Sequence, residues 1–236
     1  MILAVLEIFI KKPRILLFGA TGAVGGEVLK ALLALPQAGK VTALGRRKVE
    51  VPRGLDRSHK LSQGIVDLEK PASFAKYLKG QTHAICALGV GQPSKMAREE
   101  FVHIDRDLVL SIAKACRKAG VKSFSLLSAL GANAQSSFFY PKVKGQLEEG
   151  LRDLKFDQLR LFQPSMILTP TNRYDLMQGI LLKVWPLLNP LLIGSLSKAR
   201  GIRVAELGRA MALGAVIDAE PGVKILHWED FKALIR

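Results

Sequence analysis

The stretch Leu17-Phe-Gly-Ala-Thr-Gly-Ala-Val-Gly-Gly26 decides the fold. An apolar run, Arg14–Gly19, precedes it with the pattern of a strand, and the amphipathic stretch that follows, Ala23–Leu35, has the pattern of a helix. Gly19 permits a tight turn, Gly22 lets backbone amides approach a pyrophosphate, and the third glycine lets helix and sheet pack closely. Free N–H groups and the positive dipole end of the helix favour an anion there. The sequence therefore predicts a dinucleotide-binding turn.

The second predicted strand, Lys40–Leu44, leads into a pair of arginines, Arg46 and Arg47. A site that prefers NAD usually has Asp or Glu about 20 residues after the glycines, where the carboxylate bonds the ribose hydroxyls. Two guanidinium groups instead suit the 2′-phosphate of NADP, because they offer charge-assisted and bidentate hydrogen bonds. Surface charge for solubility is the alternative. We expect NADP(H) selectivity, with Asp67, at the end of a third strand Gly64–Leu68, contacting the adenine amino group.

Short apolar runs alternate with longer amphipathic stretches along most of the chain, as in a parallel sheet with crossover helices. The other predicted strands are Thr82–Leu88, Lys122–Ser128, Asp157–Phe162 and Val223–Leu226. The other predicted helices are Pro71–Lys79, Met96–Ala119, Pro141–Leu154, Val204–Asp218 and Glu229–Leu234. This pattern predicts an α/β fold of the doubly wound Rossmann type, with a mostly parallel sheet and helices on both faces.

The composition indicates one folded, globular domain. Of the 236 residues, 49% are hydrophobic and 23% are charged, which excludes disorder of the whole chain. The net charge of +15 raises the question of a nucleic-acid partner. The basic residues are scattered in pairs, and aromatic residues amount to only 6%, so no base-stacking stripe accompanies the charge. A solvated basic surface is favoured over nucleic-acid binding.

Cys86 and Cys116 are the only cysteines, and neither belongs to a CxxC or Cys/His cluster. Neither a disulfide framework nor a metal site is expected from them, and buried free thiols are typical of such positions. A cytoplasmic location is expected, because a reducing compartment fits this cysteine usage. Structural or surface roles are expected for the isolated histidines His59, His83, His103 and His227.

The chain is expected to divide into an N-terminal extension, residues 1–12, and a single domain, residues 13–236. The apolar run of the extension is well short of the roughly 20 residues of a membrane span, and it lacks the features of a signal peptide. Peripheral contact with a membrane stays open, as does a monomer or a homodimer. Residues 164–200 and 219–236 are expected on the substrate side. The apolar segment 173–192 is expected to cover a substrate or form a dimer surface.

Ser128 ends the fifth predicted strand, and two further polar residues, Tyr140 and Lys144, follow it. Open α/β sheets present ligands at the carboxyl ends of their strands, and a spacing of four puts Lys144 on the same helix face as Tyr140. A nearby ammonium lowers the pKa of a phenol from near 10, so that Tyr140 can exchange a proton with a carbonyl or an alcohol. Ser128 is expected to polarise and position the same substrate oxygen.

The glycine pattern, together with Ser128 and the Tyr140/Lys144 pair, resembles the atypical branch of the short-chain dehydrogenase/reductase superfamily. Five strings are more closely similar to the oxidoreductases of the HIV Tat-interacting-protein type: Val41-Thr-Ala-Leu-Gly-Arg-Arg-Lys48, Val66-Asp-Leu-Glu-Lys70, His103-Ile-Asp-Arg-Asp107, Ser125-Leu-Leu-Ser128 and Lys155-Phe-Asp157. This resemblance covers residues 13–230. It implies a seven-stranded Rossmann sheet, NADPH binding, and catalysis by Ser128, Tyr140 and Lys144, with Lys144 also holding the nicotinamide ribose.

Two local features add nothing to the resemblance: one departs from the family pattern, and the other is given no role. The string Gln163-Pro164-Ser165 stands where the family commonly has Arg-Pro-Gly, so the loop on the nicotinamide side is expected to differ. Asp105 and Asp107 lie on a predicted helix far from a second carboxylate motif, and no acid–base role is assigned to them.

The leading hypothesis is an NADP(H)-dependent oxidoreductase that acts on an unidentified carbonyl or alcohol substrate, with Tyr140 supplying the proton. The alternative is an NADPH-binding regulatory protein, a sensor with little or no turnover. A sugar-nucleotide epimerase is a third hypothesis, for which the short C-terminal portion leaves little room. The expected cofactor-binding residues are Gly19, Thr21, Gly22, Ala23, Val24, Gly25, Arg46, Arg47, Asp67, Leu68, Leu88, Gly89, Lys144 and Pro164.

Overall fold

The computed structural model describes residues 12–90, 95–170, 189–217 and 220–236. Nearly all of the predicted N-terminal extension and most of the apolar segment 173–192 lie outside these residues. Within the described part of the chain, no helix has the length and apolar character needed to cross a membrane.

A single sheet of seven strands forms the centre of the molecule, in the order β3-β2-β1-β4-β5-β6-β9. The strands are β1 Ile15–Phe18, β2 Val41–Gly45, β3 Leu61–Ile65, β4 His83–Cys86, β5 Ser123–Leu127, β6 Gln158–Phe162 and β9 Gly222–Leu226. Every neighbouring pair is parallel. The predicted Rossmann architecture is confirmed, and the sheet is parallel throughout.

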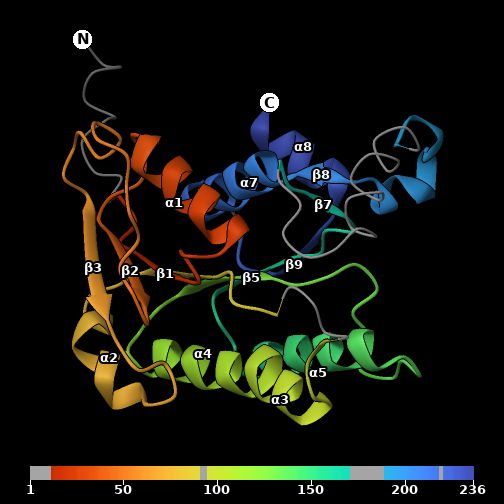
Figure 1. Ribbon diagram of the computed structural model, residues 1–236, viewed down its shortest axis with the longest axis horizontal. Coiled ribbons are helices and arrows are strands. Elements are labelled where there is room, and N and C mark those ends of the chain that lie inside the picture. The colour runs from red at the N-terminus through yellow and green to blue at the C-terminus, as the bar shows by residue number, and fades with distance from the viewer. Residues whose placement is uncertain (1–11, 91–94, 171–188, 218–219) are drawn as a thin grey trace.

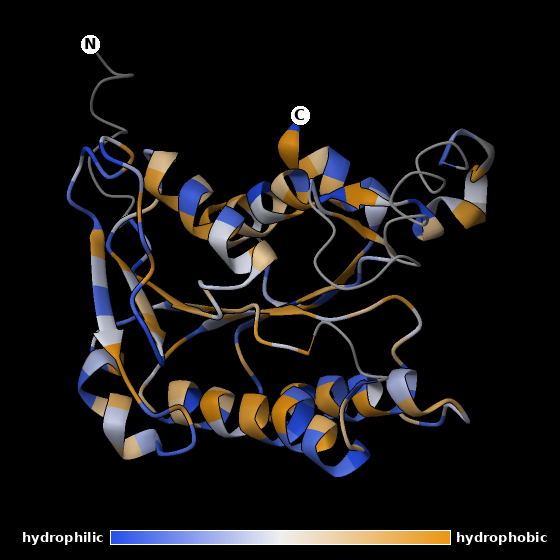
Figure 2. Ribbon diagram, in the orientation of Figure 1, coloured by the Kyte–Doolittle hydropathy of each residue, from blue (hydrophilic) through white to orange (hydrophobic). Residues whose placement is uncertain are grey.

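Helices cover both faces of the sheet (Figure 1). The helices on one face are α1 Ala23–Ala34, α7 Val204–Val216 and α8 Trp228–Ile235, and those on the other are α2 Pro71–Leu78, α3 Arg98–Val102, α4 Val109–Lys118 and α5 Phe139–Asp153. Successive residues of β1 alternate between the two cores, with Leu17 in the α1 core and Phe18 in the α4 core. Because both faces are covered, the strand β1 is apolar throughout, and the strands at the centre of the sheet are mostly hydrophobic in Figure 2.

The strand order reverses between β1 and β4, the two strands at the middle of the sheet. From β1 the chain builds outward through β2 and β3 on one side, and from β4 it builds outward on the other side. In open α/β sheets such a reversal opens a crevice at the carboxyl ends of the two strands, where ligands bind. The chain after β1, starting at Gly19, and the chain after β4, through Leu88, both enter this crevice.

The third strand spans Leu61–Ile65, so the predicted range Gly64–Leu68 was wrong. Its register pairs Gly45, the last residue of β2, with Ile65, and the strand ends there with its partner. The apolar residues Val66 and Leu68 suggested a longer strand, but they are buried where the chain crosses the end of the sheet. The N–H of Val66 donates to the carbonyl of Gly45, which completes this crossing.

The helix predicted over Met96–Ala119 consists of three segments: α3, the π-helical segment η3 (His103–Leu108), and α4. A π-helical turn holds one residue more than an α-helical turn needs, and such turns are frequent at functional sites. Here the segment carries Asp105, whose side chain is buried. Similarly, α5 begins at Phe139, so Pro141 is its third residue and not its first as predicted.

Short elements that the sequence did not predict lie near the carboxyl end of the sheet. They are the two-residue strands β7 Ile167–Leu168 and β8 Ile202–Arg203, which pair in parallel, and the 3-10 segments η4 Asn189–Leu191 and η5 Gly194–Ala199. Within residues 220–236, β9 completes the main sheet and Phe231 of α8 stacks on Phe162 of β6.

Candidate functional site

The turn between β1 and α1 requires its glycines for space. Gly19 has a φ of +86°, and a Cβ there would lie 2.6 Å from the carbonyl carbon of Ala87. A Cβ on Gly25 would overlap the carbonyl of Gly19. Gly22 has ordinary backbone angles, but its Cβ would stand 3.3 Å from the Gly19 oxygen, over the start of the helix. These positions leave an open cradle at the helix N-terminus.

The first turn of α1 is free to receive an anion. Gly22 is the N-cap, no side chain caps the helix, and its first turn contains no acidic residue. The first N–H groups of a helix have no partner within it, and the dipole places partial positive charge there. Gly22 and Thr21 are exposed. A pyrophosphate group fits this cradle.

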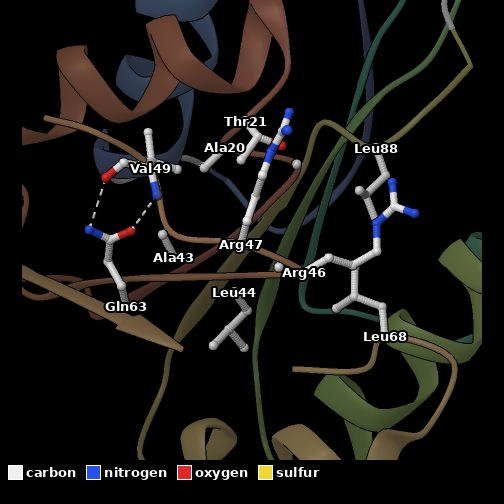
Figure 3. Close-up of a pocket in the computed structure, with 12 residues that line it drawn as sticks. Ala20, Thr21, Ala43, Leu44, Arg46, Arg47, Val49, Gln63, Leu68 and Leu88 are labelled. Atoms are coloured by element: carbon white, nitrogen blue, oxygen red, sulfur yellow. Dashed lines mark hydrogen bonds between the residues drawn. The ribbon is translucent and has the colours of Figure 1, made fainter. Parts of the chain in front are cut away.

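A cavity of about 390 Å³ lies on one side of the turn and is called the arginine cavity below. The predicted residues that line it are Gly19, Thr21, Arg46, Arg47, Leu68 and Leu88. Figure 3 shows Arg47 extending toward Ala20 and Thr21, while Arg46 extends toward Leu88. Both arginines are exposed, and neither forms an ion pair with another described residue.

Gln63 of β3 braces the chain that carries the two arginines. Its Oε1 accepts from the N–H of Val49 at 2.8 Å, and its Nε2 donates to the Val49 carbonyl at 3.2 Å (Figure 3). Gln63 also lines the arginine cavity. The amide thus fixes the backbone just after Arg47 from a neighbouring strand, an interaction that local sequence does not reveal.

Asp67 is not among the residues that line the arginine cavity, and its expected contact with adenine stays a prediction. Because β3 ends at Ile65, Asp67 lies in the following turn. Its Oδ1 accepts from the N–H of Glu69 at 3.1 Å, and its Oδ2 lies 3.2 Å from the Nζ of Lys70. The carboxylate therefore caps its own turn.

A second cavity, of about 350 Å³, lies on the other side of the glycine turn and is called the tyrosine cavity below. The predicted residues that line it are Gly22, Ala23, Val24, Leu88, Gly89, Ser128, Tyr140 and Lys144. Leu88 lines both cavities. Gly25 and Pro164 line neither; Gly25 packs against the turn, and the Pro164 carbonyl accepts from the N–H of Leu130.

Lys144 forms a buried ion pair that the sequence did not predict. Its Nζ donates to Oδ1 of Asp105 at 2.5 Å, and the two side chains are 5% and 1% exposed. The other carboxylate oxygen of Asp105 accepts from the N–H of Val90 at 2.7 Å. Burial alone would lower the pKa of Lys144, but the charges of Tyr140 and Asp105 and the bond to Asp105 outweigh it and raise that pKa. Lys144 is thus an ammonium at neutral pH.

Tyr140 and Lys144 lie one turn apart on α5, with the Lys144 Nζ 6.0 Å from the centre of the Tyr140 ring. The expected lowering of the tyrosine pKa was wrong. Burial raises the pKa of Tyr140, and although Lys144 opposes this effect, Asp105 adds to it. Tyr140 is therefore a protonated phenol at neutral pH, chiefly because it is buried, and Asp105 offsets part of the effect of the ammonium.

Ser128 donates its hydroxyl proton away from the cavity. Its Oγ donates to Oε1 of Glu148 at 2.5 Å, and all atoms involved are buried. The same oxygen accepts from Nε2 of Gln163 at 2.8 Å, while Oε2 of Glu148 lies 3.5 Å from Arg152. A hydroxyl has one proton and two lone pairs. Ser128 is therefore arranged to accept from a ligand, and the expected polarisation of a carbonyl by its proton does not fit this network.

Two residues that sequence reasoning missed, Asp105 and Glu148, support the three predicted polar groups. Both lie four residues after another buried residue and so share the buried face of their helices: Asp105 lies four residues after Phe101, and Glu148 lies four after Lys144. A charged residue at a buried helical position was the available signal. Among the residues that the structure describes, no three His, Cys, Asp or Glu side chains are grouped to hold a metal ion.

The sequence model of a family described as NAD(P)H-binding matches residues 19–165. The protein HTATIP2 of Rattus norvegicus is 37% identical over 158 residues, which are 67% of this chain and 64% of that protein, less than two thirds of its length. The protein FMP52-1, mitochondrial, of Scheffersomyces stipitis is 34% identical over 190 residues, which cover 80% of this chain and 78% of the relative.

Solved structures with the same fold hold dinucleotides. MoeE5 in complex with UDP-glucose and NAD superimposes with a TM-score of 0.67 at 17% identity, covering 91% of this chain and 76% of that one. The Citrobacter sp. triphenylmethane reductase complexed with NADP(H) superimposes with a TM-score of 0.59 at 17% identity, covering 91% and 69%. Fold and comparisons together define an NAD(P)H-binding protein with a Rossmann fold. The chain belongs to the NAD(P)H-binding family and is homologous to HTATIP2.

The expected cytoplasmic location is contradicted by the relatives. FMP52-1 of S. stipitis and the FMP52 proteins of Emericella nidulans and Lodderomyces elongisporus are named mitochondrial. The expectation rested on the cysteines, and the structure shows why they do not discriminate. Burial raises the pKa of Cys86 to about 12 and also raises that of Cys116. Buried thiols of this kind are inert in any compartment.

Proposed function

We propose that the protein is an NADP(H)-dependent oxidoreductase that interconverts a carbonyl compound and its alcohol. The observation that carries the proposal is the pair of cavities that meet at the glycine turn. With the pyrophosphate over the start of α1, one half of a dinucleotide would occupy the arginine cavity. The other half would reach the tyrosine cavity, which contains Tyr140 and Lys144.

Arg46 and Arg47 support a preference for NADP(H) over NAD(H). The strand β2 ends at Gly45 and is followed by these two cations, at the place where a carboxylate would bond the ribose hydroxyls of NAD. Both arginines line the cavity, and Figure 3 shows the side chain of Arg47 running toward Thr21 and that of Arg46 toward Leu88. A fork of N–H donors matches the oxygens of a 2′-phosphate, and the phosphate charge adds to each bond.

The tyrosine cavity supports proton transfer at a substrate oxygen. A bound nicotinamide would supply or accept the hydride. In the direction of reduction, Tyr140 donates its phenolic proton to the oxygen that becomes the alcohol. Ser128, whose own proton is held by Glu148, then accepts a hydrogen bond from the new hydroxyl. Lys144 stays charged beside them and is positioned to hold the ribose hydroxyls of the nicotinamide half.

Besides the polar residues Ser165 and Thr169, the lining of the tyrosine cavity includes the apolar side chains of Leu127, Met166 and Ile167. They favour a substrate whose carbonyl or alcohol carbon carries apolar substituents, because such groups bury without losing hydrogen bonds. Asp105 and Lys144 are paired with each other and offer no free charge for a strongly ionic substrate.

Cofactor preference is tested by comparing the melting temperature with NADPH, NADP and NADH, since a ligand that binds only the native state raises it. We expect NADPH and NADP to raise it more than NADH does. Replacing Arg46 and Arg47 by Ala should weaken NADPH binding by about ten- to a hundredfold, the equivalent of one or two charge-assisted bonds, and leave NADH binding unchanged. Arg53→Ala, an exposed arginine outside the cavity, is the matched control. Equal affinities for NADPH and NADH would contradict the preference.

Turnover is tested by following NADPH oxidation with a panel of apolar aldehydes and ketones. The Tyr140→Phe variant should lose about 10²- to 10⁴-fold in rate, because it lacks the proton donor, while binding NADPH as the wild type does. NADPH binding without reduction of any compound would instead favour the sensor that regulates a partner and turns over little.

A further inference from the structure

Asp105 is a carboxylate with no part in the proposed chemistry, yet it is held tightly at its centre. Both of its oxygens are engaged, one by Lys144 of α5 and the other by the N–H of Val90 after β4. The backbone at Gly89 packs on the pair so closely that a Cβ there would lie 3.3 Å from the carboxylate and 3.7 Å from the Lys144 Nζ. The carboxylate therefore ties η3 to two other elements of the site.

The π-helical segment is what brings this carboxylate to the site. Asp105 is in the middle of η3, and the exposed Asp107 two residues further on pairs with Arg106 at the surface. Burying a charge is costly unless it is paired and hydrogen-bonded. Among the described residues, Asp105 meets that condition through Lys144 and Val90, which indicates that its position is built around the lysine.

Besides burial, the charges that face Tyr140 act on its pKa and so on how readily it loses its proton. Lys144 and Asp105 are the charged groups that act on the phenol, and the ring of Phe101 packs on it at 5.7 Å between ring centres. Cys86 also faces Lys144, but burial raises the pKa of this thiol to about 12, so it carries no charge at neutral pH. An unbalanced ammonium would draw the phenol toward phenolate; Asp105 removes that imbalance.

We propose that Asp105 is a positioning residue: its carboxylate holds the Lys144 ammonium and keeps Tyr140 as the protonated phenol that a reduction consumes. This inference rests on the proposed function. In the reduction, a bound reduced nicotinamide would supply the hydride by breaking the C–H bond at its C4 and becoming oxidised. A new C–H bond forms at the carbonyl carbon, and the π electrons of the carbonyl move to oxygen. The oxygen takes the proton of Tyr140, and solvent then reprotonates the phenolate. Without Asp105, Tyr140 would lose its phenolic proton at a lower pH than it does in the wild type.

The inference is tested without substrate or cofactor, by titrating Tyr140. Phenolate absorbance is recorded from neutral pH to about pH 11 for the wild type and for Asp105→Asn, each measured against the same protein carrying Tyr140→Phe. The Asp105→Asn protein should form its Tyr140 phenolate about one pH unit or more below the wild type. Asp107→Asn, which removes an exposed carboxylate two residues away, should leave the titration unchanged. Coincident curves for the wild type and Asp105→Asn would overturn the proposal.

A second pair of variants covers the case in which Asp105→Asn fails to fold. Lys144→Met alone leaves the Asp105 charge beside Tyr140, and adding Asp105→Asn removes it while leaving no unpaired buried charge. The double variant should form phenolate about one pH unit below Lys144→Met; identical titrations would again count against Asp105.

The rate of carbonyl reduction gives an independent reading of the same proton. It should fall as pH rises through the titration of Tyr140, and in Asp105→Asn the fall should move to lower pH by the shift seen in absorbance. An absorbance shift with no NADPH binding or turnover would refute the proposed function and leave the electrostatic role of Asp105 standing. Turnover with no shift in either profile would refute the role of Asp105 alone.

Discussion

The two cavities on either side of the glycine turn use charge in opposite ways. In the arginine cavity the charges belong to Arg46 and Arg47, which are exposed and lack carboxylate partners among the described residues. In the tyrosine cavity the charges of Lys144 and Asp105 are almost completely buried and paired with each other. Exposed charges are free to meet a ligand, and buried ones are committed before a ligand arrives. The first arrangement suits recognition and the second suits control of a proton.

The physical basis of this contrast is the surrounding medium. Water and salt screen exposed charges within about 10 Å at ordinary ionic strength, so each contributes little to the stability of the fold. Buried charges interact strongly with each other, and removing one partner leaves the other without compensation. The two cavities should therefore respond differently to substitution, to pH and to salt.

The largest difference is expected in stability. Asp105→Leu should lower the free energy of unfolding by about 3–5 kcal/mol, because Lys144 is left buried and unpaired. The double replacement of Arg46 and Arg47 by Ala should change it by no more than about 0.5 kcal/mol, as is usual for surface positions. Urea unfolding at neutral pH measures both. Asp107→Leu is the matched control and should behave like the arginine variant; similar losses for Asp105 and Asp107 would break the comparison.

A comparable effect, spread over about three pH units, is expected at Cys86, which faces the Lys144–Asp105 pair. Burial raises the pKa of this thiol from 9.0 to about 12. The unfolded chain therefore loses the proton above about pH 9, while the folded chain keeps it, and unfolding becomes more favourable as pH rises. The stabilisation is complete below pH 9 and falls by about 1.4 kcal/mol per pH unit until about pH 12.

Urea unfolding of the wild type and of Cys86→Ala between neutral and alkaline pH measures this contribution. The variant should lose stability less steeply above pH 9, because it has no thiol to ionise. Parallel curves for the two proteins would mean that the thiol is not shielded by the core.

The smallest effect concerns salt. Raising NaCl from about 0.05 to 0.5 M should weaken NADPH binding roughly two- to fivefold, since the arginines that meet the 2′-phosphate are open to solvent. NADH binding should change less, and the stability difference between wild type and Asp105→Leu should hardly change. Equilibrium titrations at both salt concentrations give the affinities. If salt weakened the binding of NADPH and of NADH equally, the arginines would not be contacting the 2′-phosphate.

Local chemistry made part of this molecule predictable. The glycine turn, the order of strands and helices, and the place of Ser128, Tyr140 and Lys144 around one crevice all follow from spacing and turn residues, which act over a few positions. The comparisons and the sheet topology confirm the fold that these signals predict.

What the sequence did not reveal depends on contacts between distant segments. The end of β3 is set by its pairing with β2, so the apolar residues Val66 and Leu68 misplaced both the strand and Asp67. The ion pair of Lys144 joins residues 39 positions apart. Burial, with a further contribution from Asp105, reverses the expected direction of the Tyr140 pKa. Periodicity alone also cannot show where a helix widens, as it does before α4.

The widened turn η3 has an evolutionary consequence. The wide turn absorbs one extra residue, so deleting one residue between His103 and Leu108 would restore regular winding and leave the helix on either side in phase. Phe101 would keep its packing on Phe139 and Tyr140, while the carboxylate of Asp105 would lose the turn that carries it. The loss of a single codon is therefore enough to remove the buried charge pair without changing the glycine turn that is proposed to bind the dinucleotide.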